Sequence, residues 1–243
     1  MPCALCLRDE PLQNSHILPE FLYGAMYDEK HRYNILTLTP ESLERFEQKG
    51  ARERLLCGAC EQHFGNLERY ASLVINGGAP GVEGQPDGSM VHITGIDYTK
   101  FKLFQLSLLW RSGVAKHRYF EQVRLGPHEE RLRVMLLEGD PGAFDLYPCL
   151  VWVVSLEPDT IAKLMIQPCR DRVWGHTTYH FVVPGLKLVY FVSRQPLSTK
   201  QSQFVLQHNG SLIFQVRSAL ELPSLTRFME QFEKGRRGSP GGG

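Results

Sequence analysis

The sequence has almost no net charge, because 27 lysine and arginine residues face 26 aspartate and glutamate residues in a chain of 243. A strongly basic chain would favour nucleic-acid binding, and this balance removes that support without excluding a local basic patch. No apolar run approaches the roughly 18 residues that a membrane-spanning helix requires. We therefore expect no membrane partner.

The N-terminus also lacks the basic stretch followed by an apolar stretch that marks a signal peptide. Cysteine is scarce, with six residues arranged as two CxxC pairs and two single residues. That arrangement is typical of metal binding in a reducing compartment rather than of a disulfide framework. We therefore expect a cytoplasmic protein. The apolar content of 42% and the charged content of 22% are those of an ordinary globular chain without repeats.

Two CxxC pairs are the strongest chemical signal in the sequence. Cys3 and Cys6 form the first pair, and Cys57 and Cys60 form the second. Each pair can offer two thiolates to one tetrahedral Zn²⁺, and four sulfur ligands describe a closed structural site. The alternative of redox or free cysteines lacks a thioredoxin-like sequence context. We predict one structural Zn²⁺.

The first 70 residues or so resemble the HNH endonuclease family, whose module is a zinc-stapled treble clef of ββα type. The resemblance lies in the first CxxC, the segment SHILPEF that contains His16, and the segment LLCGACEQHF that leads into a helix. A group of poorly characterised bacterial proteins shares the SHI-x-P and LLCxxCE motifs. The resemblance implies a nuclease that hydrolyses phosphodiester bonds of DNA or RNA, with a role in bacterial defence by analogy.

In this family the histidine after the first CxxC pair is the general base, so the resemblance assigns that role to His16. An imidazole that titrates near about pH 6.5 can take a proton from water close to neutrality. A residue just before the base and one on the helix hold a divalent ion, here Mg²⁺ or Mn²⁺, on the scissile phosphate.

The sequence departs from the family pattern at three places. Ser15 stands where Asp or His is usual, and Glu61 stands where His or Asn is usual, with His63 two residues further on. The middle Asn is missing, and Glu53 lies in the stretch where it would stand. Either the site is a variant in which Glu53, Glu61 or His63 supplies ligands, or catalysis has been lost.

A second hypothesis follows from these departures and from the near-zero net charge. The module would then be a catalytically inactive, zinc-stabilised unit that binds nucleic acid or a protein partner. Under either hypothesis Arg52, Arg54 and Arg69 are candidates for phosphate contacts, although solvated arginines are the commoner case.

The fold class that we predict is α+β, with the zinc module followed by helices and a mainly antiparallel sheet. A dense cluster of glycine and proline at 76–90 predicts a linker. It would separate the module at 1–75 from an α+β domain at 91–235, which could mediate oligomerisation, and residues 236–243 would form a disordered tail.

Local patterns predict the individual elements. Residues 10–15 are expected to be a polar turn, the chain from Ser15 to begin as a short strand, and 42–53 to be helix or loop. The expected helices are 61–74, 99–116, 127–138 with Gly139 as the stop, 221–233, and a short one after Pro19. The expected strands are 33–38, 91–98 and five short runs from about 146 onward. On this pattern His176 and His180 lie on a strand, where they would not share a metal, and Cys149 and Cys169 are buried apolar residues.

Overall fold

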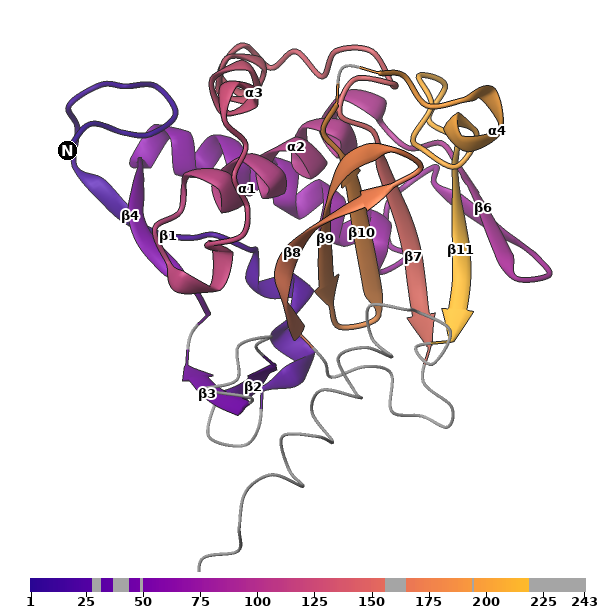
Figure 1. Ribbon diagram of the computed structural model, residues 1–243, viewed down its shortest axis with the longest axis horizontal. Coiled ribbons are helices and arrows are strands. Elements are labelled where there is room, and N and C mark those ends of the chain that lie inside the picture. Colours follow the sequence, from indigo (N-terminus) through magenta and orange to yellow (C-terminus); the bar gives the residue numbers. More distant parts are fainter. Residues whose placement is uncertain (28–31, 37–43, 49, 156–164, 194, 219–243) are drawn as a thin grey trace, which may run out of the picture.

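The computed structural model describes residues 1–27, 32–36, 44–48, 50–155, 165–193 and 195–218. Over these ranges the chain is an α+β structure with a mainly antiparallel sheet, as the sequence predicts (Figure 1). The helix expected at 221–233 and the tail expected at 236–243 lie outside the described residues.

The N-terminal unit is built from two strands and a helix. β1 (Leu12–His16) pairs antiparallel with β4 (Arg52–Cys57), and α1 (Gly58–Ile75) follows β4 without a loop. Phe64, Leu67 and Ala71 of α1 are buried at helical spacing, which confirms the helix predicted from their pattern.

Two expectations in this unit are wrong. Strand β1 occupies most of the segment expected to be a polar turn, because β4 provides hydrogen-bonding partners for its backbone whatever the side chains are. After Pro19 the chain forms two 3₁₀ turns, Glu20–Leu22 and Gly24–Met26, rather than a regular helix.

A nine-stranded sheet forms over the described residues. Its order is β3-β2-β8-β9-β10-β7-β11-β6-β5, and all neighbours are antiparallel except the parallel pairs β2–β8 and β7–β11. Its strands are β2 (Arg32–Leu36), β3 (Glu44–Gln48), β5 (Glu83–Asp87), β6 (Met90–Thr94), β7 (Cys149–Ser155), β8 (Met165–Val173), β9 (His176–Val183), β10 (Leu186–Phe191) and β11 (Leu212–Ser218).

The segment expected to be a linker contains a strand of this sheet. β5 pairs with β6 through a tight turn in which Gly88 has a φ of +58°. Pro86 is tolerated because β5 is an edge strand, where a missing N–H disrupts no second ladder. Residues 44–48 are also a strand, β3, where helix or loop was expected.

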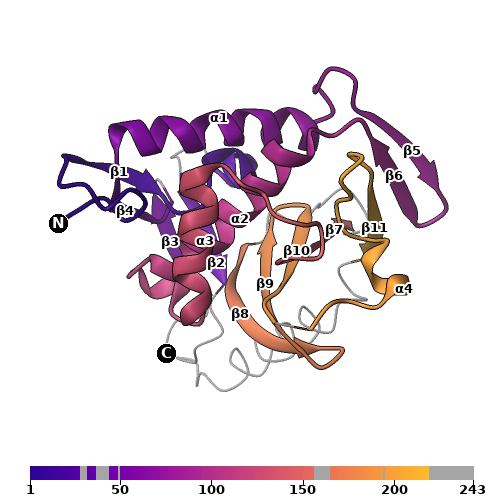
Figure 2. The same ribbon diagram turned by 90° about the horizontal axis from the view of Figure 1, so that it is seen from above.

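Helices α2 (Tyr98–Val114) and α3 (Pro127–Glu138) follow the predicted ranges closely, and Gly139 ends α3 in the left-handed conformation. A 3₁₀ turn, Arg118–Phe120, separates them, and a short helix, α4 (Thr199–Ser202), precedes β11. Figure 2 shows α1, α2 and α3 grouped beside the sheet, with the β5–β6 hairpin projecting at the far end.

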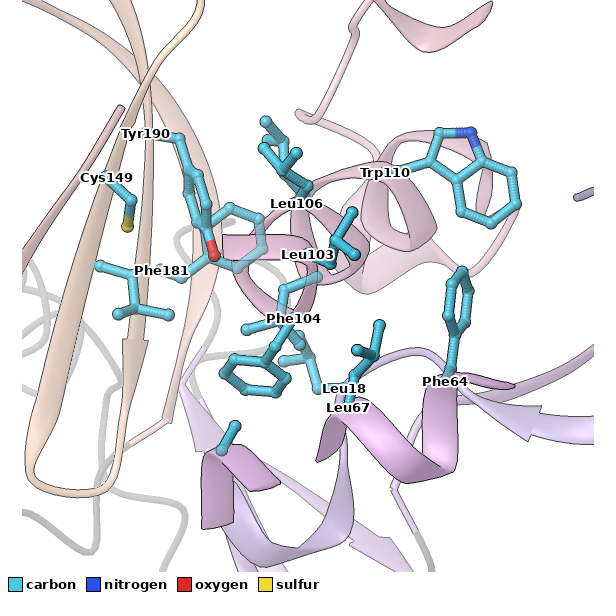
Figure 3. Close-up of a cluster of buried hydrophobic side chains, with 14 of the residues drawn as sticks. Leu18, Phe64, Leu67, Leu103, Phe104, Leu106, Trp110, Cys149, Phe181 and Tyr190 are labelled. Carbon is cyan, nitrogen blue, oxygen red and sulfur yellow. The ribbon is translucent and has the colours of Figure 1, made fainter. Parts of the chain in front are cut away.

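Helix α2 is buried on all sides from Phe101 to Ser112 and joins the N-terminal unit to the sheet. In Figure 3 its Leu103 and Leu106 lie between Phe64 and Leu67 of α1 on one side and Phe181 and Tyr190 of the sheet on the other, and its Trp110 lies next to Phe64, away from the sheet. One hydrophobic cluster therefore runs from the cysteine pairs through α2 to β10. Cys149 lies inside this cluster, as predicted, whereas Cys169 is only partly buried.

Candidate metal centre

The four predicted cysteines come together at one point. The sulfur atoms of Cys3, Cys6, Cys57 and Cys60 all lie within 4.8 Å of one another, although the two pairs are 51 residues apart in sequence. The Sγ atoms of Cys6 and Cys57 are 3.8 Å apart. Zn–S bonds of about 2.3 Å place the sulfurs of a tetrahedral site about 3.8 Å apart, so this spacing fits zinc.

Local geometry prepares the cysteines for a metal. Cys57 is the N-cap of α1, and its backbone N–H donates to the Cys3 sulfur at 3.3 Å. Burial opposes ionisation of Cys3, but hydrogen bonds from backbone groups of Cys6, Cys57 and Leu5 outweigh it and lower its pKa to about 7. Burial raises the pKa of Cys60, so a cation is needed to hold all four as thiolates.

The first cysteine pair is also anchored from a distant helix. Arg133 of α3 donates to the carbonyl oxygen of Leu5 at 2.6 Å and pairs with Glu130 at 2.7 Å. The backbone N–H of Ala4 donates to the carbonyl of Leu55 on β4. The loop that carries Cys3 and Cys6 is therefore fixed by protein contacts on both sides.

Ser15 and Glu61 meet beside this centre. The Ser15 hydroxyl, which is fully buried, donates to a carboxylate oxygen of Glu61 at 2.6 Å. Ser15 lies on β1 and Glu61 in the first turn of α1, where the positive end of the helix dipole favours a carboxylate. Two positions 46 residues apart thus converge, and both were singled out from the sequence.

His16 is half-buried at the end of β1, and its ring packs edge-on against Tyr23 at 6.4 Å between centroids. Its carbonyl oxygen accepts a hydrogen bond of 2.9 Å from Arg111 of α2. The Arg111 guanidinium is almost fully buried, pairs with Glu68 of α1 at 2.7 Å and lies over the Phe64 ring.

Arg111 and Glu68 are site residues that sequence reasoning did not find. Arg111 stands in the apolar stretch LSLLWRSGVA, and a charged residue in a stretch that becomes a buried helix is the signal that could have identified it.

Glu53 is already occupied by main-chain donors. Its two carboxylate oxygens accept hydrogen bonds from the backbone N–H groups of Lys116 and His117, the first at 3.1 Å. These bonds tie β4 to the segment that leaves α2. Glu53 therefore has a structural partner on each oxygen.

The remaining candidates are more dispersed. His63 is half-buried on α1 and packs beside Phe64, with its Nε2 atom buried and without a hydrogen-bond partner. Arg54 and Arg69 are exposed, and Arg52 is half-buried. Within the described ranges, the four cysteines are the only group of three or more His, Cys, Asp or Glu side chains with ligand atoms this close together.

The other predicted residues keep to their expected environments. His176 and His180 lie on β9, where His176 contacts Ser193 and His180 contacts Thr178.

Of the helices that the structure describes, none combines the length and apolar character that a bilayer crossing requires.

Comparison of the chain with protein-family models, with curated proteins and with solved structures finds no match.

Proposed function

We propose that the chain is a metal-dependent nuclease of HNH type that hydrolyses phosphodiester bonds of DNA or RNA. The observation that carries the proposal is the 2.6 Å hydrogen bond between Ser15 and Glu61, next to His16 and beside the cysteine centre. The resemblance assigns these two positions to the ion-binding residues of such an enzyme, and the fold brings them together.

The donor set at this point suits a hard divalent cation. The family usually has a neutral Asn or a His on the helix and an Asp or His before the base. In this chain the strand carries the Ser15 hydroxyl and the helix carries the Glu61 carboxylate. The negative charge of the site therefore lies on the helix instead of on the strand. Mg²⁺ is commonly held by one or two carboxylates, with water and substrate phosphate filling the remaining positions.

The chain's own residues divide the work as follows. Glu61 would hold the ion, and a bound ion would place positive charge against the phosphate and its leaving oxygen. His16 would take the proton from the attacking water. Arg111 would fix the backbone of His16 through its carbonyl oxygen, and so act as a positioning residue rather than a catalytic one.

The test is cleavage of supercoiled plasmid and of labelled single-stranded RNA, with and without added Mg²⁺ or Mn²⁺. We expect cleavage by the wild type only with added metal, and a loss of at least about 100-fold in His16→Ala and Glu61→Gln. His92→Ala is a matched control, because His92 lies on the β5–β6 hairpin and is partly exposed. Equal activity in wild type and His16→Ala, at equal zinc content, would refute the assigned role.

A second function has an observation in its favour. Both carboxylate oxygens of Glu53 already accept hydrogen bonds from main-chain N–H groups, and the described residues contain no second metal group of three ligands. These features favour a catalytically inactive zinc module that binds nucleic acid or a protein. Absence of cleavage combined with nucleic-acid binding that weakens in Arg54→Gln and Arg69→Gln would select this function.

A further inference from the structure

An apolar cavity of about 430 Å³ lies between the N-terminal unit and the sheet. Its walls come from the 3₁₀ turn after Pro19, the C-terminal end of α1, one side of α2, and strands β7, β10 and β11. Its lining includes none of the four cysteines and none of the residues assigned to catalysis. Each of these elements contributes at least one apolar side chain to the lining: Phe21, Ile75, Phe101, Val151, Leu188 and Phe214.

The described lining contains no charged side chain and two polar ones, Asn76 and Gln105. Asn76 is exposed and donates to Ser72, so it belongs to the surface. Gln105 is only 2% exposed, and neither its amide nitrogen nor its amide oxygen has a hydrogen-bond partner.

A buried amide without partners is costly, because both its donor and its acceptor have lost water without replacement. Buried polar groups without hydrogen-bond partners are rare in native proteins, and a bound molecule can supply the missing hydrogen bonds. Ligand pockets in proteins share this composition, with apolar walls of about 300 to 1,000 Å³ and a few polar groups that fix orientation.

We propose that this cavity, the Gln105 cavity, binds an uncharged and mainly apolar small molecule that carries an amide-like group. In a lactam or a primary amide an N–H donor lies on the same side as the carbonyl acceptor, so such a group can donate to Oε1 of Gln105 and accept from Nε2 at the same time. A charged ligand is disfavoured, because the described lining offers no counter-charge to offset its desolvation. The proposal does not depend on nuclease activity.

The test uses 2-quinolone, an apolar bicyclic lactam, and its N-methyl form, which keeps the shape but lacks the donor. Binding to the full-length zinc-loaded protein is measured by calorimetry and by shifts in the NMR spectrum. We expect 2-quinolone to bind about tenfold more tightly than its N-methyl form, which reflects one buried hydrogen bond. Gln105→Leu should erase this preference and raise the melting temperature of the unliganded protein.

Two further variants separate binding from folding. Gln167→Leu is the matched control, because Gln167 is equally buried but its amide donates to the Arg118 carbonyl and to Glu121. It should lower the melting temperature and leave the lactam preference intact. Val151→Phe should fill the cavity and abolish binding of both compounds. Failure of 2-quinolone to bind the wild type, or equal affinity for the lactam and its N-methyl form, would overturn the proposal.

Discussion

At the residue scale, Arg111 connects three elements through one buried guanidinium. It donates to the His16 carbonyl on β1, pairs with Glu68 on α1 and belongs to α2. Removing one partner of a buried ion pair leaves the other charge without compensation, which destabilises more than the pair itself contributes. The position therefore matters for stability as well as for the placement of His16.

We expect Arg111→Met to lower the free energy of unfolding by about 2–4 kcal/mol, because Glu68 and the His16 carbonyl both lose a donor. Urea denaturation followed by circular dichroism measures the change. Arg172→Met is the control, since Arg172 is exposed on β8 and should shift stability by less than about 0.5 kcal/mol. Equal effects of the two substitutions would show that the buried contacts contribute nothing.

His180 makes stability depend on pH. Burial, together with the smaller effect of the nearby Lys187 and against the opposing effect of Asp171, lowers its pKa to about 4. Because the unfolded chain binds the proton near pH 6.5 and the folded chain does not, stability is lost as pH falls from 6.5 towards 4.

Between pH 7 and pH 5, His180 should reduce the free energy of unfolding by about 2 kcal/mol. We expect His180→Asn to lose this part of the pH dependence, measured as the difference between variant and wild type so that acid effects on the cysteines cancel. A pH profile parallel to that of the wild type would contradict the assigned pKa.

At the scale of elements, two glycines test the account of helix ends. Gly139 ends α3 with a φ of +69°, whereas Gly65 lies inside α1, and an added Cβ meets no atom within 4 Å at either position. Space is therefore the same at both sites, and only the backbone conformation differs.

We expect Gly139→Ala to destabilise by about 1 kcal/mol, because a side chain is strained in the left-handed region. Gly65→Ala should stabilise by about 0.5–1 kcal/mol, because alanine favours the helix interior. Thermal denaturation of both variants gives the two signs directly. If both substitutions changed the stability in the same direction, the left-handed backbone at Gly139 would not explain the effect of Gly139→Ala.

The elements also show where sequence reasoning worked. α1, α2 and α3 were predicted from apolar spacing, and the Gly139 stop from its residue type, since these signals are local. β3 and β5 were missed, and β1 begins three residues before the strand expected at Ser15. The polar, Gly-rich or Pro-containing sequences of these segments become strands only through partners elsewhere in the chain. For the site, cysteine spacing predicted the cluster of four cysteines. The hydrogen-bond partners of Glu53 and His16 come from α2 or the segment that follows it, and no local pattern predicts them.

At the scale of the whole molecule, the N-terminal unit and the sheet share one hydrophobic cluster. The segment at 76–90, which was expected to separate them, contributes strand β5 to the sheet instead. The cysteine centre should therefore support the stability of the whole chain rather than of a separate module.

Removal of zinc by a chelator should lower the melting temperature by more than about 10 °C, because binding energy at a structural site is folding energy. We expect a single transition, reported alike by tryptophan fluorescence and by far-ultraviolet circular dichroism. Two transitions, one of which is unchanged by the chelator, would mean that the hydrophobic cluster does not couple the unfolding of the N-terminal unit to that of the sheet.

The number and place of bound metal ions distinguish a nuclease site at Glu61 from a zinc module without one. Zinc is counted by elemental analysis, and Mn²⁺ added to the zinc-loaded protein is counted by electron paramagnetic resonance. We expect one zinc and one Mn²⁺ per chain, with Glu61→Gln losing the Mn²⁺ but keeping the zinc, and Cys57→Ser losing the zinc. A wild-type chain that binds zinc but no Mn²⁺, or Mn²⁺ binding unchanged in Glu61→Gln, would contradict this expectation.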